Sequence, residues 1–446
     1  MKGLPSEMFR SYRQLATKKP ELLWDGYLNT LREIENSPAK YKGKPVEFLY
    51  QPFFLTEAQW KDLETITGKM LELTKKVIDH YLEFPEFRRY FGFDPLMEKL
   101  ILKEPGYSYW IPMTRIDVFY HFDGFFQFCE INTDGSSGMT ECRELQQIIR
   151  SSPALTALPL NDEAIEEGEF FDSWVQAFLS NYREYSNGNE TPNIAIVDWF
   201  QAEVPSEFME FQKAFQKADC RTKIVDVRDL TYREGRLQAG DFCVDAVYRR
   251  LVSWEVVERY PETRALVDAY LAGDVCVIGP LRSQIPHNKR FFAVLHQESA
   301  TDFLSTEDRR FIKEHIPYTA ILNRNNPDRW KEWAENKDQY IIKPEDLYAS
   351  SGVCAGRDYH PDEWEKLLAE AAEKDYLIQK YCQVLRMPML MFQNGRPIFE
   401  EQQYLMGCFL YNENFQGPYI RTGRKSIIGS VVECYTVPAY KIRETE

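Results

Sequence analysis

The segment Phe128-Cys-Glu-Ile-Asn-Thr-Asp-Gly-Ser-Ser-Gly-Met139 begins as a strand and ends as a loop rich in glycine and serine. Glu130 and Asn132 are two residues apart, so on a strand both side chains point to the same face. A carboxylate beside an amide oxygen suits Mg²⁺, a hard ion that shares its ligands with water and phosphates. The following loop offers backbone N–H groups and hydroxyls, which suit an anion. A metal ion, a nucleotide phosphate and an anionic substrate could meet here; the alternative is a strand that ends in an ordinary Asp-Gly turn.

The composition is that of a globular protein, with 44% hydrophobic and 28% charged residues among 446, a length that predicts about three domains. The net charge of −15 argues against binding to nucleic acid or to an acidic membrane surface. No apolar run reaches the roughly 18 residues of a membrane span, and the first residues lack an apolar signal core. We therefore expect a cytoplasmic protein that does not bind membranes.

Nine cysteines are scattered along the chain, and none forms a Cys-x-x-Cys pair. This spacing predicts reduced and mostly buried thiols. The six histidines are equally dispersed, so we expect no zinc site.

Apolar residues recur at helical spacing from Leu63 to Val77, which predicts helices in the first hundred residues. From about residue 107 the pattern becomes strand-like. Ile116–Tyr120 and Phe125–Ile131 flank a His-Phe-Asp-Gly turn and predict a hairpin. A helix is expected over Thr140–Arg150.

Four short apolar runs alternate with helical segments between residues 191 and 285. This alternation predicts a small parallel α/β domain. The expected strands are Ile194–Val197, Thr222–Val227, Asp245–Tyr248 and Val275–Ile278.

Tyr340-Ile-Ile-Lys-Pro-Glu-Asp-Leu-Tyr-Ala-Ser-Ser-Gly-Val353 reads as a strand, two acids, a loop of small residues and a second strand. Lys343 at the strand end can contact a phosphate, and Pro344 stops the strand. Either Glu345 or Asp346 could hold a metal ion, and the loop could cover phosphates with its N–H groups. Further on, the strand Tyr376–Tyr381 could present its backbone to an adenine edge.

The order of these segments resembles the ATP-grasp superfamily, most closely its circularly permuted members, the eukaryotic-type glutathione synthetases and glutathionylspermidine-synthase-like proteins. The resemblance covers about residues 107–430. It implies a mixed α/β fold in four parts: an N-terminal helical region (1–105), the hairpin and metal/substrate-loop part of the core (106–190), a small parallel α/β substrate-side domain (191–285) and the nucleotide-binding part (286–446).

The resemblance also assigns roles to individual residues. Arg115, Lys343 and Arg421 are the expected catalytic residues, and Glu130, Asn132 and Asp346 the expected Mg²⁺ ligands, with Glu345 as the alternative to Asp346. The nucleotide-binding residues are expected to be Lys289, Lys343, Tyr348, Ser350, Ser351, Gly352, Gln379, Lys380, Tyr381, Arg424 and Lys425. The substrate-binding residues are expected to be Arg115, Asp134, Ser136, Ser137, Tyr248 and Arg250, with Arg250 facing inward and Arg249 structural or solvated.

The implied activity is an ATP- and Mg²⁺-dependent carboxylate–amine ligase that forms a peptide-like amide through an acylphosphate. Its partners would be a small acid and a small amine, such as an amino acid, a peptide or a polyamine. A homodimer is compatible with the sequence, which does not determine the oligomeric state. The phosphate loop has a single glycine and the closing segment Ile420–Gly429 lacks a Gly-Gly pair, which favours an alternative: a nucleotide-binding homologue without ligase turnover. A metal hydrolase that uses no nucleotide is a third interpretation, with no His/Asp cluster to support it.

Overall fold

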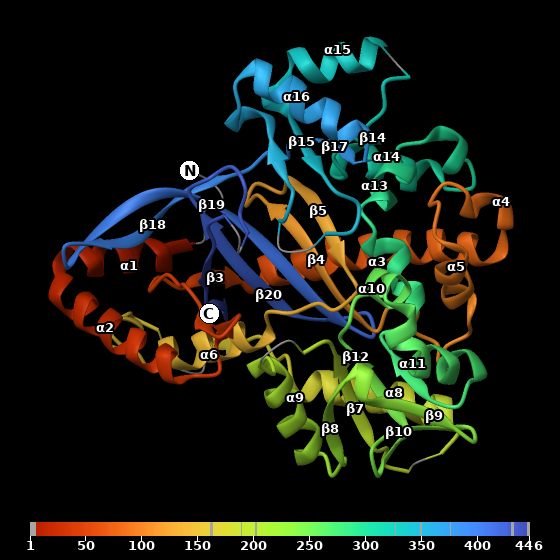
Figure 1. Ribbon diagram of the computed structural model, residues 1–446. Coiled ribbons are helices and arrows are strands. Elements are labelled where there is room, and N and C mark those ends of the chain that lie inside the picture. The colour runs from red at the N-terminus through yellow and green to blue at the C-terminus, as the bar shows by residue number, and fades with distance from the viewer. Residues whose placement is uncertain are drawn as a thin grey trace.

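The computed structural model describes residues 6–160, 164–188, 190–200, 203–325, 327–347, 350–374, 376–429 and 432–443. Its centre is a six-stranded antiparallel sheet in the order β21-β20-β19-β4-β5, with β18 paired to β19 (Figure 1). The predicted hairpin is β4 and β5, and β5 is an edge strand. The strands are β4 (Met113–Tyr120), β5 (Phe126–Asn132), β18 (Arg386–Gln393), β19 (Arg396–Tyr411), β20 (Asn414–Gly423) and β21 (Tyr435–Val437).

The long helix α3 (Glu57–Glu83) packs on this sheet through the apolar stripe that its sequence predicts. Its first turn is closed by a capping box, in which Thr56 and Gln59 bond each other's backbone. All residues of β4 except Phe119 are buried, because the sheet is covered on both faces. This core fixes the edge on which Glu130 and Asn132 lie.

The predicted parallel sheet is present in the order β13-β12-β7-β8, with every pair parallel. Its strands β7 (Ile194–Asp198), β8 (Thr222–Asp226), β12 (Ala246–Arg249) and β13 (Cys276–Ile278) agree with the predicted runs within two residues. Helices α8 (Asp172–Ser186), α9 (Ser206–Lys217), α10 (Ser253–Glu258) and α11 (Tyr260–Ala272) accompany it. A small antiparallel sheet of β9 (Leu230–Arg233), β10 (Arg236–Ala239) and β11 (Phe242–Val244) was not predicted, because its strands are only three or four residues long.

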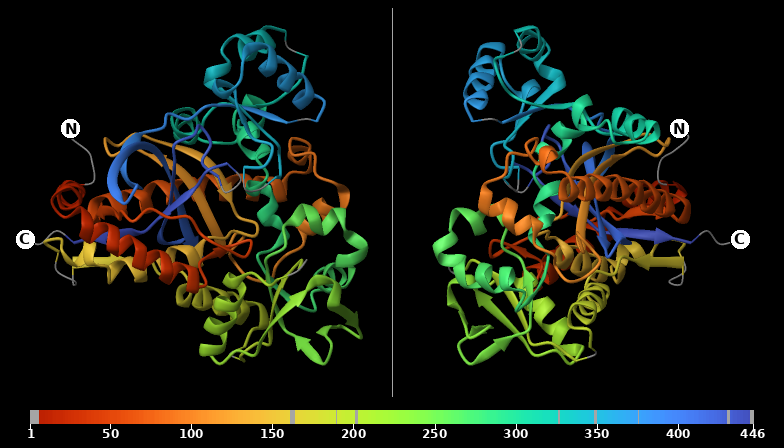
Figure 2. Two further views of the ribbon diagram at one scale, coloured as in Figure 1. Left: turned by 60° about the vertical axis from the view of Figure 1, so that its left-hand side comes forward. Right: turned by 90° about the vertical axis from the view of Figure 1, so that its right-hand side faces the viewer.

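A third sheet has the order β14-β17-β15-β16 and is antiparallel. It consists of β14 (Thr319–Ile321), β15 (Tyr340–Lys343), β16 (Cys354–Ala355) and β17 (Leu377–Lys380), and α15 (Pro327–Glu335) and α16 (Pro361–Ala372) form the lobe with it. The connecting helices are α12 (Gln284–His287), α13 (Arg290–Leu295) and α14 (Thr306–His315). Two further views show the central sheet between this lobe and that of the parallel sheet (Figure 2).

The first hundred residues contain α1 (Ser6–Lys18), α2 (Pro20–Asn36), α3, α4 (Pro85–Arg88) and α5 (Pro95–Leu102), as the prediction of helices requires. The region also contains strands, which corrects that prediction: the hairpin of β1 (Lys40–Tyr41) and β2 (Lys44–Pro45), and β3 (Phe53–Thr56). β3 pairs with β22 (Ala439–Ile442), and β22 also pairs with β6 (Ile165–Glu167). In the sequence, β6 follows the helices α6 (Met139–Arg150) and α7 (Pro153–Thr156). Only the returning C-terminal strand makes β3 a strand, so local sequence does not reveal it. No helix in the described ranges is long and apolar enough to cross a membrane.

Candidate active site

Strands β4 and β5 bring four polar side chains together at the edge of the central sheet. Their register pairs Asp117 with Glu130 and Arg115 with Asn132. The Asn132 amide donates to Glu130 Oε1 at 3.3 Å, so the two side chains share a face as predicted.

Two lysines reach Glu130 from other parts of the chain. Lys289, between α12 and α13, places Nζ 3.8 Å from Glu130 Oε2. Lys343, at the end of β15, is buried, and its Nζ donates to the carbonyl of Cys129 at 3.4 Å. Burial alone would raise the pKa of Glu130, but Lys289, Lys343 and two nearby arginines lower it to about 2. The carboxylate is therefore ionised at neutral pH and faces two cations.

Asp346 and Glu345 have different surroundings. Asp346 Oδ2 accepts hydrogen bonds from Gln284 (3.0 Å) and Asn288 (2.9 Å), whereas Oδ1 is buried without a partner within the described residues. Burial raises the pKa of Asp346 to about 6. Glu345 instead binds Arg290, with 2.7 Å between Oε1 and Nε. Asp346 is thus the better candidate for a metal ligand.

The three oxygen-bearing side chains Glu130, Asn132 and Asp346 fit Mg²⁺, since all are hard donors and Asp346 Oδ1 has an unused lone pair. Within the described ranges, no three His, Cys, Asp or Glu side chains converge on one point. A cation here would complete its shell with water or phosphate oxygens.

Arg115 and Arg421, expected to contact the phosphate or the substrate, both bind Asp117. Arg115 Nε lies 2.9 Å from Asp117 Oδ1, and Arg421 Nη2 lies 2.5 Å from Oδ2. Asp117 is fully buried, and both guanidinium groups also lie over the ring of Tyr419. This carboxylate, for which no role in the site was predicted, therefore holds both arginines.

The loop after β5 is held by the protein itself. Asp134 forms a buried ion pair with Arg249 and accepts a hydrogen bond from the N–H of Ser253, at the start of α10, so it has a structural role. Ser136 Oγ donates to the carbonyl of Asn132 at 2.7 Å, and the Ser137 carbonyl accepts from Arg115 at 2.8 Å.

A carboxylate of the chain occupies the end of this loop. Glu207 Oε2 accepts from the N–H groups of Gly138 (3.1 Å) and Thr140 (3.2 Å), where α6 begins. Its Oε1 accepts from Arg250 at 3.0 Å. Of the residues expected to bind the substrate, Arg250 thus binds Glu207, together with two N–H groups at the end of the loop. A glutamate in the first turn of an amphipathic helix is ordinarily solvated, so no sequence signal identified it.

The two arginines at the end of β12 are both buried. Arg249 binds the carbonyls of Gly279 and Leu251 as well as Asp134, which makes it structural, as expected of one of the pair. Arg250 lies beside the Tyr248 hydroxyl (2.9 Å). Solvation of Arg249, the alternative to a structural role, is therefore wrong.

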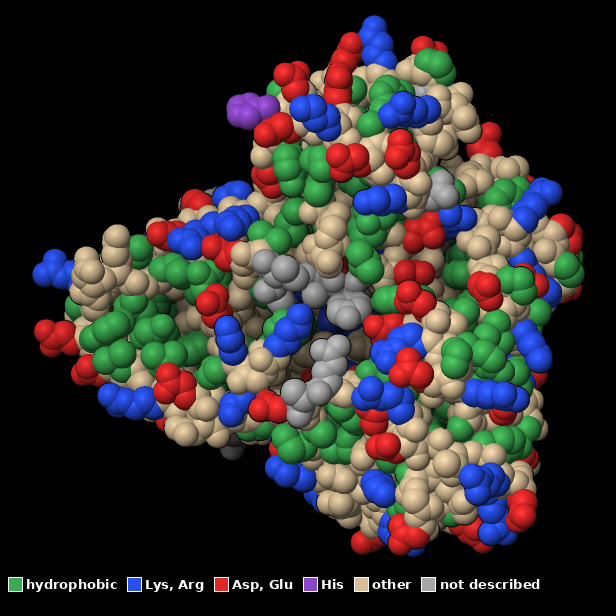
Figure 3. Space-filling model, viewed as in Figure 1, with side chains coloured by type: hydrophobic (Ala, Val, Ile, Leu, Met, Phe, Trp, Pro, Cys, Tyr) green, Lys and Arg blue, Asp and Glu red, His purple; other side chains and the backbone are tan. Residues whose placement is uncertain are grey.

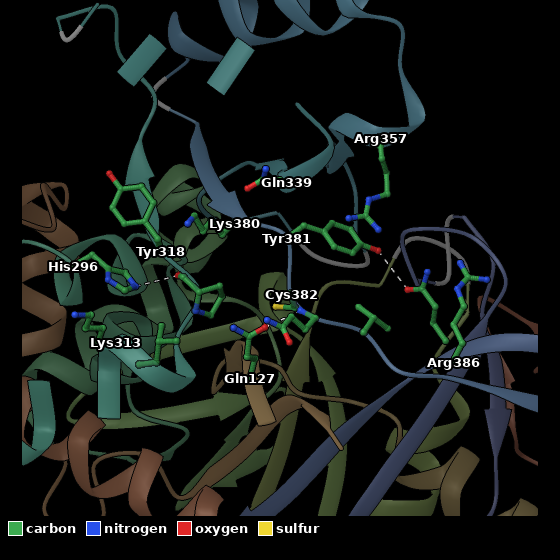
Figure 4. Close-up of a pocket in the computed structure, with 15 residues that line it drawn as sticks. Gln127, His296, Lys313, Tyr318, Gln339, Arg357, Lys380, Tyr381, Cys382 and Arg386 are labelled. Carbon is green, nitrogen blue, oxygen red and sulfur yellow. Dashed lines mark hydrogen bonds between the residues drawn. The ribbon is translucent and has the colours of Figure 1, made fainter. Parts of the chain in front are cut away.

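The expected adenine segment lines a cavity of about 700 Å³ (Figure 4). Lys380 and Tyr381 lie on its wall, whereas the Gln379 side chain is buried and bonded to Thr319 at 3.0 Å. The N–H groups of Lys380 and Tyr381 already bind the carbonyls of Tyr318 and Gln339. They are thus not free to bind a base.

The remaining predicted nucleotide residues are distributed around this region. Ser350 and Gly352 both have positive φ, 61° and 71°, and Ser351 lies between them, while Tyr348 lies outside the described residues. Arg424 pairs with Glu433 at 2.7 Å, and Lys425 is exposed. The surface is hollowed where the lobes meet, and charged side chains surround the hollow (Figure 3).

No protein-family model and no curated protein sequence matches this chain. Solved structures do match. A glutathione synthetase-like effector from Globodera pallida, in its apo form, is 12% identical, with a TM-score of 0.63 over 95% of this chain and 98% of that one. A protein provisionally described as a gamma-glutamylcysteine synthetase, from Methylobacillus flagellatus, is 11% identical, with a TM-score of 0.44 over 84% and 88%. A D-cycloserine synthetase is 13% identical, with a TM-score of 0.31 over 56% and 92%.

The first match confirms the predicted fold class: the chain has a mixed α/β, glutathione synthetase-like ATP-grasp fold. At 12% identity this match concerns the fold alone.

Proposed function

We propose that this protein is an ATP- and Mg²⁺-dependent carboxylate–amine ligase of the circularly permuted ATP-grasp type. The convergence of Lys289 and Lys343 on Glu130, with Asn132 and Asp346 nearby, supports this best. Two cations beside a carboxylate and an amide oxygen, with Asp346 near Lys289, suit a triphosphate and its metal ion. We further propose a small acid and a small amine as substrates, a cytoplasmic location, and the division into four parts at residues 105, 190 and 285.

In the proposed reaction, a carboxylate oxygen of the acid attacks the γ-phosphorus of ATP, and the bond from phosphorus to the ADP oxygen breaks. The amine nitrogen then bonds to the acyl carbon, inorganic phosphate leaves, and the nitrogen loses a proton. Lys289 and Lys343 would neutralise the phosphates, and Arg115 would face the acid. Mg²⁺ on Glu130, Asn132 and Asp346 would neutralise phosphate charge and polarise the P–O bonds.

Phosphate release with MgATP, screened against amino acids, small peptides and polyamines, tests the proposal. We expect release that requires both an acid and an amine. ATP binding without acid-dependent release under any combination would overturn ligase activity.

A nucleotide-binding protein without turnover is the second candidate, and Glu207 favours it. This carboxylate already accepts hydrogen bonds from the N–H groups of Gly138 and Thr140, and it neutralises the guanidinium of Arg250. A substrate carboxylate would have to displace Glu207 or bind elsewhere. Retained nucleotide binding in a protein inactive toward the whole panel would support this candidate.

A further inference from the structure

The cavity beside β17 is lined by four basic side chains and by no described aspartate or glutamate. Lys313 comes from α14, Arg357 from the turn after β16, Lys380 from β17 and Arg386 from β18 (Figure 4). The protein as a whole carries a net charge of −15, so this local excess of positive charge does not follow from composition.

All four side chains are exposed, and Lys380 lies close enough to Glu332 to help lower the pKa of that carboxyl, after its hydrogen bonds with Tyr340 and Arg329. Within the described ranges, Lys313 and Lys380 have no ion-pair partner. Arg357 donates to the carbonyl of Asp338 at 2.9 Å and lies over the Tyr381 ring at 3.6 Å, and Arg386 donates to a backbone carbonyl at 3.3 Å. Charges left without a counterion in a hollow attract an anionic ligand.

The cavity is separate from the lysines assigned to the triphosphate. The register of β15 and β17 pairs Lys343 with Leu377 and Tyr340 with Lys380. These two pairs are three residues apart, which is about 10 Å along a strand. Because side chains three residues apart on a strand face opposite ways, Lys343 and Lys380 lie on opposite faces of this sheet.

In dinucleotide-binding Rossmann sites a carboxylate holds a ribose hydroxyl, and an arginine in that place accommodates a phosphate on the ribose. We propose that this cavity binds a phosphate monoester, in addition to the triphosphate at Lys289 and Lys343. The phosphate could be on the ribose of the bound nucleotide or on a separate small molecule. The first source rests on the proposed nucleotide function, and the second does not.

The test compares three titrations by calorimetry: AMP, adenosine 3′,5′-bisphosphate and ribose 5-phosphate. The variant Lys313→Gln/Lys380→Gln removes the two unpaired cations, and Lys366→Gln on α16 is the matched control, since it removes an exposed lysine of the same lobe outside the cavity. A non-hydrolysable ATP analogue reports separately on the triphosphate site.

If the phosphate is on the ribose, the bisphosphate should bind about tenfold more tightly than AMP, and the double variant should remove that difference. If the ligand is separate, ribose 5-phosphate should bind alone and in the presence of the analogue, again only with both lysines. Binding of the analogue should be nearly unchanged by Lys313→Gln alone, which keeps Lys380. If neither phosphate ligand responds to the double variant, the inference is overturned, whereas failure of the analogue alone would overturn the nucleotide function and leave the phosphate site standing.

Discussion

Glu207 and Arg250 form a buried ion pair, with 3.0 Å between Oε1 and Nη2. The pair joins α9 to the end of β12 and, through Gly138 and Thr140, to the start of α6. Removing one partner of a buried pair leaves the other charge uncompensated, which costs about 3–5 kcal/mol.

Glu207→Ala should therefore lower the melting temperature markedly, because Arg250 and two N–H groups lose their acceptor. Acetate should restore part of the loss by occupying the vacated site, with no such effect on the wild type. Glu262→Ala, which breaks an exposed pair with Arg259, is the control and should change the melting temperature little. If acetate stabilises both variants equally, the loop is not an anion site.

Arg250→Lys should raise the KM of the acid substrate and leave that of the nucleotide nearly unchanged, because lysine cannot reproduce the forked guanidinium. The expectation applies if Glu207 yields its place to the substrate. An unchanged KM, together with a lowered melting temperature, would assign Arg250 a structural role only. Steady-state kinetics with each substrate varied in turn distinguishes the two results.

Arg249→Lys should destabilise the fold by about 3 kcal/mol while nucleotide affinity is preserved. Arg249 binds the carbonyls of Gly279 and Leu251, the Ser283 hydroxyl and Asp134 in a buried setting, and lysine cannot satisfy them together. Urea unfolding and nucleotide titration measure the two effects. Loss of nucleotide binding in a fully folded variant would contradict the structural role.

Lys343→Ala and Lys289→Ala should each weaken ATP binding by about 1.5–3 kcal/mol, the range for a charged hydrogen bond. AMP binding should suffer less, because both lysines lie at the expected phosphate end. Calorimetric titration of both nucleotides is the measurement, with Lys366→Ala as a surface control. Equal losses for ATP and AMP would place neither lysine at the outer phosphates.

Glu130→Gln should nearly abolish ATP turnover and leave the fold intact, since the substitution keeps the shape and removes the charge that Mg²⁺ needs. Phosphate release at increasing Mg²⁺ concentration, with circular dichroism to monitor the fold, tests it. Normal turnover with an unchanged Mg²⁺ dependence would remove Glu130 from the site.

Asp198, which is not one of the proposed metal or nucleotide ligands, should make the free energy of unfolding depend on pH. Burial raises the pKa of its carboxyl from 3.8 to about 6, against the hydrogen bond from the N–H of Trp199. Between pH 4 and 6 the folded state binds more protons than the unfolded state, so the free energy of unfolding decreases as pH rises through this window. Asp198→Asn should therefore be more stable than the wild type at pH 8, by up to about 3 kcal/mol, and little more stable at pH 4. Urea unfolding at both pH values would contradict this if the difference did not depend on pH.

Local pattern was sufficient for most of the strands and for the facing of Glu130 and Asn132. Alternation of apolar and polar residues, or a short apolar run, indicates a strand whatever its neighbours in space. Side chains two residues apart on a strand point to the same face. Two kinds of segment were missed: very short strands, as within residues 230–244, and segments whose state depends on a distant partner. Phe53–Thr56 is a strand only because Ala439–Ile442 returns beside it.

The charged residues show the same division. The choice between Glu345 and Asp346 stayed open in the sequence, because both follow Lys343 closely. The structure favours Asp346 as the ligand because Arg290, on a different element, already pairs with Glu345. Likewise, nothing near Glu207 in the chain shows that its partner is Arg250.

The sequence by itself thus determined the order of the motifs and the types of side chain available to a nucleotide and a metal ion. Only the tertiary structure decided which charges neutralise each other. Lys289 and Lys343 lie near Glu130, Arg115 and Arg421 both bind Asp117, and Glu207 pairs with Arg250. The physical reason is that charge pairing depends on distance in space and on burial, which residues far apart in the chain acquire only when the sheets pack.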